Sequence, residues 1–189
     1  AHVELAPAQF EHYIRELSSG AIRQGQVTSP SSHKEEHHSQ QAINGNTLGN
    51  LIAKGEGDYN SYNKGVAGDA RGHKIDFSGM TIAELQRRQD LPKGHEDRLF
   101  AVGKYQIIPS TMDEAVKNLN LKGTEKLTPE LQERIFAEYL IAEKRPAIKA
   151  YITGATQGGK GLHAAQEALA SEWASVADPD TGRSKYGHI

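Results

Sequence analysis

One carboxylate in the chain stands between two glycines. Glu56, in the stretch AKGEGDYNSYNKG, follows a short apolar run and precedes several tyrosine and asparagine residues. A carboxylic acid donates a proton to a leaving group when its surroundings raise its pKa toward the working pH. The carboxyl end of a helix does this, and flanking glycines let a ligand approach closely. Glu56 is therefore a candidate general acid; the alternative is an exposed glutamate at a helix end.

The stretch GKYQIIPST, residues 103–111, is a second candidate site. The amide of Gln106 can donate and accept hydrogen bonds, which suits the hydroxyl and acetamido groups of aminosugars. The alternative is a buried connection into a helix, in which Gln106 caps a turn.

Together the two motifs resemble the phage-lambda-type lysozyme family. The resemblance covers about residues 51–186 and includes the Glu56 segment, the stretch AVGKYQIIPST, the helix after it and the late SEWASV. It implies a lysozyme-like fold and a muramidase that cleaves the β-1,4 bond between N-acetylmuramic acid and N-acetylglucosamine in peptidoglycan. In that scheme Glu56 protonates the leaving oxygen, and Gln106 and Tyr105 position the sugars.

Goose-type lysozymes and lytic transglycosylases are similar at a greater distance. The chain departs from these families in two places. A long insertion, residues 72–99, precedes the Gln106 motif, and Gly57 stands where soluble transglycosylases usually carry serine.

A second carboxylate would decide the mechanism, because glycoside hydrolases generally use two. Asp69, in GVAGDARG, resembles the water-positioning acid of goose-type lysozymes. Asp76 is the reserve, and Asp58 stands too close to Glu56 in sequence to face it easily. Each of these residues is alternatively a turn-forming aspartate. If none faces Glu56, the single-acid chemistry of a lytic transglycosylase, which forms a 1,6-anhydro sugar, is favoured.

Aromatic side chains are the third element of the expected site. Tyr62 and Tyr59 could stack on sugar faces or bond to acetamido groups. Tyr139 resembles a helix tyrosine that lies near the acid in transglycosylases, and its alternative role is core packing. The sole tryptophan, Trp173, fits a core position better than a sugar-binding one.

Composition excludes several other classes of function. The 189 residues include no cysteine, which removes disulfides, thiolate nucleophiles and cysteine-based zinc sites. A net charge of -2 gives no general attraction to nucleic acid, and no apolar run is long enough to span a membrane. The histidines of HKEEHHSQ, residues 33–40, are expected in a solvated loop, so we predict no metal site and no cofactor.

The predicted fold is mainly α, of the α+β class, with a small β-hairpin over residues 65–80 beside the cleft. Thr81 and Thr128 are expected helix N-caps, and the first is followed by Glu84 in a capping-box pattern. The expected helices cover residues 47–54, 81–89, 110–121, 129–144, 147–153 and 161–176.

Residues 1–46 are predicted to be an N-terminal helix and a polar linker, and residues 47–189 a catalytic domain. The absence of a signal peptide indicates delivery to the periplasm or cell wall by phage lysis or by a secretion system. A carrier domain and an immunity protein are possible partners beside the glycan strands, and a monomer is expected. The sequence leaves open hydrolysis against transglycosylation, endolysin against secreted toxin, and a non-catalytic glycan-binding module.

Overall fold

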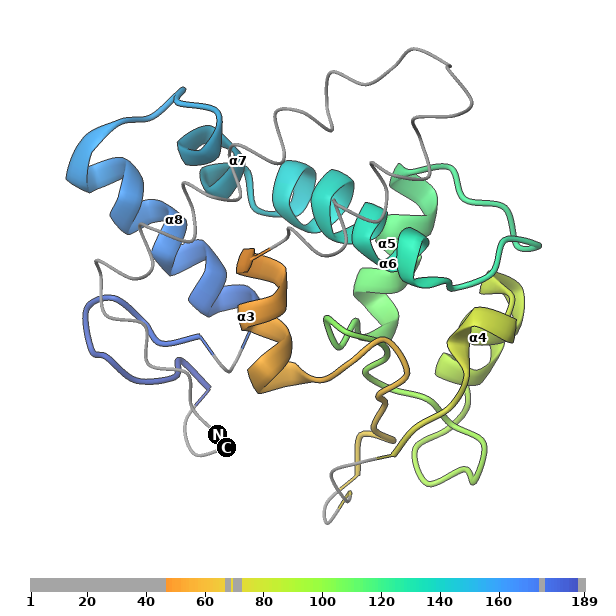
Figure 1. Cartoon of the computed structure of the whole chain (residues 1–189). Coiled ribbons are helices and arrows are strands. Elements are labelled where there is room, and N and C mark those ends of the chain that lie inside the picture. Colours follow the sequence, from red (N-terminus) through yellow and green to blue (C-terminus); the bar gives the residue numbers. More distant parts are fainter. Residues whose placement is uncertain (1–46, 67–68, 70–72, 174–175, 187–189) are drawn as a thin grey trace. The chain divides into compact units, whose positions relative to one another are not determined.

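The described part of the chain is built mainly from helices (Figure 1). The computed structural model describes residues 47–66, 69, 73–173 and 176–186, so the predicted N-terminal helix and linker lie outside the described residues. The helices are α3 (Thr47–Glu56), α4 (Ile82–Gln89), α5 (Pro109–Asn118), α6 (Pro129–Ile135), α7 (Pro146–Ile152) and α8 (Gly158–Glu172), with a 3-10 helix η1 (Phe77–Gly79) and a π-helical segment η2 (Phe136–Lys144).

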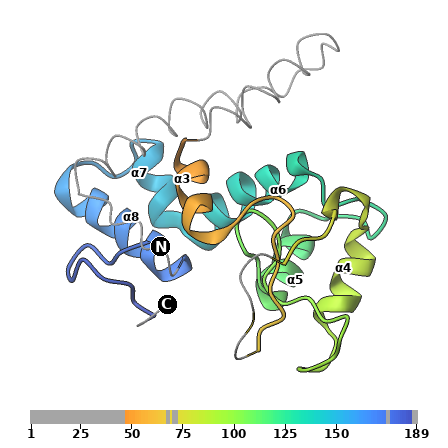
Figure 2. The same cartoon turned by 60° about the horizontal axis from the view of Figure 1, so that its bottom comes forward.

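The chain divides into two compact units. One unit is Glu56–Leu140, and the other joins the described residues up to Gly55 with those from Ile141 onward. In the second unit, α7 packs against α8 (Figure 2). Every residue proposed above for the site belongs to the first unit, which is therefore the one that positions the chemistry.

Local capping signals explain where two helices of the first unit begin. The hydroxyl of Thr81 accepts a hydrogen bond from the Glu84 amide (3.2 Å), and that of Thr128 accepts one from the Leu131 amide (3.2 Å). Both N-caps were predicted from the sequence, and both are confirmed. α5 differs from its prediction, since it begins at Pro109, whose missing N–H and fixed φ suit a first helical position.

Two helix ends differ from the predicted ones. α3 does not stop at Lys54 but continues through Gly55, so Glu56 is its last residue. The single helix predicted over residues 129–144 is α-helical only to Ile135 and then becomes the π-helical segment η2. Such segments are rare in proteins and often occur at functional sites.

The region of the predicted β-hairpin contains short backbone pairings and no strand among its described residues. Ser61 and Lys74 form an isolated antiparallel bridge, and Tyr62 forms another with Val102. Residues 60–63 therefore lie between residues 73–75 and residues 100–103. The mainly helical class is confirmed, whereas the β-hairpin and the lysozyme-like fold stay predictions.

Each unit contains its own buried apolar side chains. In the Glu56–Leu140 unit, the fully buried side chains include Phe77, Ile82, Leu85, Leu99, Met112, Leu127, Ile135 and Phe136. Trp173, in the other unit, is also buried, in agreement with its predicted core position. Among the described residues, no helix is both long enough and apolar enough to cross a membrane.

Candidate functional site

Glu56 and Gln106, the two principal predicted site residues, belong to neighbouring segments of the same unit. Glu56 ends α3, and Gly57 follows it. A Cβ atom at Gly57 would lie 3.5 Å from Nε2 of Gln106 and 2.8 Å from Cβ of Ser61. The position directly after the predicted acid therefore faces the predicted sugar-binding amide. The same contacts explain why glycine stands here, since a serine would collide with Ser61.

Gln106 is held in an unusual backbone conformation. Its φ of 49° lies in the left-handed region, which a residue other than glycine rarely occupies. Its side-chain Nε2 donates to the carbonyl oxygens of Gly103 (2.7 Å) and Ser61 (3.2 Å). These bonds help to hold a conformation that costs on the order of 1–3 kcal/mol, and such costs concentrate at functional sites. They also correspond to the turn-capping role that the sequence offered as the alternative for Gln106.

The loop that carries Gln106 is also fixed from α4. Gln89 is buried, and its Nε2 donates to the carbonyl oxygens of Phe100 (2.8 Å) and Ile107 (3.1 Å). One amide therefore holds both ends of the loop, while residues 102 and 107 pair through their backbones. Sequence analysis missed this role of Gln89.

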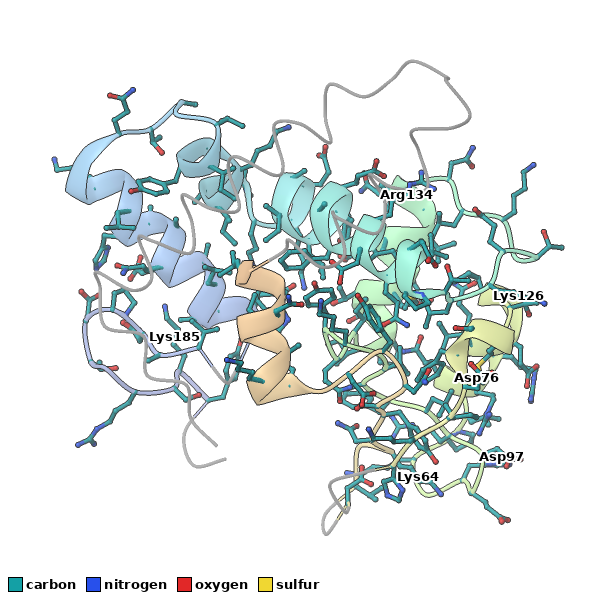
Figure 3. All side chains as sticks on the ribbon, in the orientation of Figure 1. Lys64, Asp76, Asp97, Lys126, Arg134 and Lys185 are labelled. Carbon is teal, nitrogen blue, oxygen red and sulfur yellow. The ribbon has the colours of Figure 1, made fainter. Side chains whose placement is uncertain are left out.

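Asp69, the predicted second acid, holds a turn. Its Oδ2 accepts hydrogen bonds from the backbone amides of Lys64 (2.5 Å) and Gly65 (2.8 Å), and Figure 3 labels Lys64. Its Oδ1 lies 3.2 Å from Nε2 of His73. Both carboxylate oxygens therefore have local partners, as expected of the turn-forming aspartate that was the alternative reading.

The other two candidate acids also have local partners. Asp58 accepts a hydrogen bond from the Asn60 amide (2.9 Å) and pairs with Lys74. The hydrogen bond from Lys74 lowers the pKa of the Asp58 carboxyl below its usual range. Asp76, labelled in Figure 3, caps η1 by accepting from the Ser78 amide (3.0 Å).

Tyr62 lies among aromatic side chains and is partly exposed. Its ring stacks on His73, with 5.3 Å between centroids, and the edge contact with Phe77 has 6.4 Å between centroids. His73 also pairs with Asp69. The two predicted site residues Tyr62 and Asp69 therefore both contact His73.

Tyr105 and Tyr139 are both buried and hydrogen-bonded. The ring of Tyr105 stacks on Phe136 with 4.2 Å between centroids, and its hydroxyl donates to Glu133 (2.9 Å to Oε2). The hydroxyl of Tyr139 donates to Oε2 of Glu114 (2.5 Å). For Tyr139 the structure thus identifies Glu114, on α5, as a hydrogen-bond partner.

Two adjacent residues of α6, Gln132 and Glu133, connect the segment after Glu56 with the segment before Gln106; we call them the α6 clamp. Gln132 donates to the carbonyl of Tyr59 (2.9 Å) and accepts from the amide of Lys104 (3.0 Å). Glu133 accepts from the Tyr59 hydroxyl (2.9 Å), the Lys104 ammonium (2.6 Å) and the Tyr105 hydroxyl.

Sequence analysis missed the α6 clamp, although a signal for it exists. Gln132 lies one helical turn before Phe136 and two turns before Tyr139, so helical spacing places it on an inward face. Gly103 in the structure lies against Gln132 of the clamp. Its φ is 77°, and a Cβ atom there would lie 2.3 Å from Oε1 of Gln132, so only glycine fits.

One group of side chains in the described part of the chain has the spacing of metal ligands. His163, Glu167 and Asp180 each offer a ligand atom, and these atoms lie within 4.8 Å of one another. Nε2 of His163 already lies 2.6 Å from Oδ1 of Asp180 as an exposed ion pair. The histidines of residues 33–40 lie outside the described residues.

Comparison of the chain with models of protein families, with curated proteins and with solved structures gives no match.

Proposed function

We propose that the protein cleaves the glycan strands of peptidoglycan, with Glu56 as the proton donor. The observation that supports this best is the proximity of Gly57, next to Glu56, to the amide of Gln106, whose Nε2 lies 3.5 Å from where a Cβ atom on Gly57 would be. Two motifs that are far apart in the sequence, and that a lysozyme-type site needs together, lie in neighbouring segments. The substrate would be the β-1,4 bond between N-acetylmuramic acid and N-acetylglucosamine, so the enzyme would act on the bacterial cell wall.

In this proposal the two side chains have separate tasks. Glu56 protonates the glycosidic oxygen as the bond to the sugar breaks, and the sugar develops oxocarbenium character. The nitrogen of the Gln106 amide is engaged by two carbonyl oxygens, so its oxygen is the atom that would accept from an acetamido N–H or a hydroxyl. Phage lysis or a secretion system would bring the enzyme to the wall.

A lytic transglycosylase is the second candidate function. Asp58, Asp69 and Asp76 each hold a local turn, cap or ion pair. A residue with such partners is poorly suited to activate water. In a transglycosylase one glutamate acts first as acid and then as base, and the 6-hydroxyl of the muramic acid replaces water.

Product analysis on purified peptidoglycan tests both candidates. We expect Glu56→Gln to lower the rate by about 10²- to 10⁴-fold, because it removes the transferable proton and keeps the shape. Glu138→Gln is the matched control, since it makes the same change at an exposed glutamate. Near-normal cleavage by the Glu56 variant would contradict the proposal.

The mass of the products separates the two mechanisms. Reducing muramic acid ends carry an added water, and 1,6-anhydro ends do not. A hydrolase that uses Asp69 should also lose most of its rate in Asp69→Asn, whereas a transglycosylase should keep it if the turn stays folded. Binding to peptidoglycan without any cleavage would instead indicate a glycan-binding module.

A further inference from the structure

The α6 clamp places a largely buried charge between the two segments of the proposed site. The side chain of Lys104 is 5% exposed and that of Glu133 is 12% exposed, and their charged atoms are 2.6 Å apart. The ammonium group also lies 5.1 Å from the ring centroid of Tyr59 and 5.3 Å from that of Tyr105. An ion pair that is mostly removed from water needs further hydrogen bonds to be stable, and two tyrosine hydroxyls supply them.

The tyrosines remain hydrogen-bond donors over a wide pH range. Burial first, and then the negative charge of Glu133, raise the pKa of Tyr59 and that of Tyr105 well above the ordinary value. Glu133 thus accepts from three groups at once. Lys104 and both tyrosine hydroxyls therefore surround the carboxylate oxygens of Glu133.

The clamp is bonded to residues that lie close in sequence to Glu56 and to Gln106. Tyr59 stands three residues after Glu56, while Lys104 and Tyr105 directly precede Gln106. Gln132 connects the same two segments through backbone groups, so adjacent residues of one helix fix the main chain and the side chains together.

We propose that Glu133 is a positioning residue: it joins the Tyr59 and Lys104–Tyr105 segments and so sets the distance between the Glu56 carboxyl and the Gln106 amide. This inference rests on the proposed function. The neighbouring motifs of the site would then depend on a residue that touches no substrate. Misplacement of a reacting group by about 1 Å costs on the order of 10²-fold in rate, so loosening the clamp should slow the chemical step.

The first test is Glu133→Gln, which keeps the size of the side chain and removes its charge. We expect turnover on purified peptidoglycan to fall by about 10- to 100-fold. Retention on insoluble peptidoglycan should change by less than about threefold, because the sugar-binding groups remain. Glu138→Gln, with the same change on the exposed side of the helical segment, should leave both unchanged. Unchanged turnover in the Glu133 variant would overturn the inference.

A double-variant experiment separates positioning from general destabilisation. If Glu133 acts through Glu56, adding Glu133→Gln to Glu56→Gln should lower the residual rate by less than about twofold. Independent losses that multiply would overturn the inference. Failure of Glu56→Gln itself to lower the rate would instead overturn the proposed function, so the two failures are distinguishable.

A milder variant keeps the test valid if Glu133→Gln does not fold. Tyr59→Phe removes one hydroxyl from the clamp and leaves the Lys104–Glu133 pair in place. We expect a several-fold loss of turnover at temperatures where circular dichroism shows the variant fully folded. Full activity in a folded Tyr59→Phe variant would overturn the positioning role of the clamp.

Discussion

Two ion pairs involve the same helical segment and have the same N–O distance, but their surroundings differ. Lys104 Nζ and Glu133 Oε1 are 2.6 Å apart, as are Arg134 Nε and Glu138 Oε2. The first pair has side chains that are 5% and 12% exposed, whereas those of the second are 44% and 53% exposed. Figure 3 labels Arg134, the residue that directly follows Glu133.

The difference shows why distance alone says little about an ion pair. The Arg134–Glu138 pair links two residues of one helical segment that water also solvates, and such pairs contribute little to stability. The Lys104–Glu133 pair joins α6 to a loop far away in sequence, and two tyrosine hydroxyls share its carboxylate. Only the buried pair can therefore fix the relative position of separate segments.

The largest expected effect comes from removing one partner of the buried pair. Glu133→Ala leaves Lys104 without its counter-charge in a largely buried position, which should cost about 3–5 kcal/mol in the free energy of unfolding. Glu138→Ala should cost less than about 1 kcal/mol. Urea unfolding of both variants measures the difference. Equal losses would contradict the contrast between the two pairs.

The second largest loss of stability is expected when a side chain is added at Gly103, where the Gln132 amide of the clamp lies close to the backbone. Gly103→Ala introduces a positive-φ alanine and a Cβ atom 2.3 Å from Oε1 of Gln132, and we expect a loss of about 2–4 kcal/mol. Gly94→Ala is the matched control, because Gly94 has a φ of 92° and no atom near its Cβ position. The control should lose only the backbone cost, about 1 kcal/mol. Similar losses in thermal unfolding would show that the Gln132 contact is unimportant.

Features that depend on short stretches of sequence could be predicted from the sequence. Thr81 and Thr128 were predictable because an N-cap depends on a few adjacent residues. The mainly helical class followed from apolar periodicity. Glu56 and Gln106 were chosen through a resemblance, and in the structure Gly57, which follows Glu56, lies near the Gln106 amide.

The remaining features depend on contacts between distant residues, which local patterns do not encode. Glu133 was missed because it stands between the polar residues Gln132 and Arg134, so it resembles one more exposed position of α6. Asp69 looked like a possible catalytic acid, and its bonds to Lys64, Gly65 and His73 became visible only in the folded chain. The π-helical conformation of η2 could not be predicted either, because its sequence has ordinary helical periodicity.

The effect of losing a hydrogen bond from an uncharged donor to a carboxylate should fall between those of the buried and the exposed ion pairs. Tyr139 donates to Glu114 from a buried position. Tyr139→Phe keeps the ring and removes this bond, so we expect a loss of about 1–2 kcal/mol in urea unfolding. Tyr186→Phe is the control, since its hydroxyl bonds to the Ser171 carbonyl from an exposed side chain. A loss as large as that of Glu133→Ala would show that burial, rather than paired charge, dominates.

The smallest effect is expected at a solvent-accessible pair in the other unit, His163 and Asp180. The hydrogen bond from His163 to Asp180 raises the pKa of the imidazole above its ordinary value of 6.5. Asp180→Asn should therefore bring the pKa of His163 back toward 6.5, as an NMR titration of the imidazole protons would measure.

The sign of the pH dependence follows from that shift. Because the folded state binds the proton more tightly than the unfolded state, the pair stabilises the protein below pH 6.5 and loses this contribution as pH rises through the raised pKa. The stability difference between the parent and Asp180→Asn should therefore shrink from pH 6 to pH 8. A difference that grows with pH would contradict this sign. Because both side chains are in water, the whole difference should also weaken with added salt, unlike that of the Lys104–Glu133 pair.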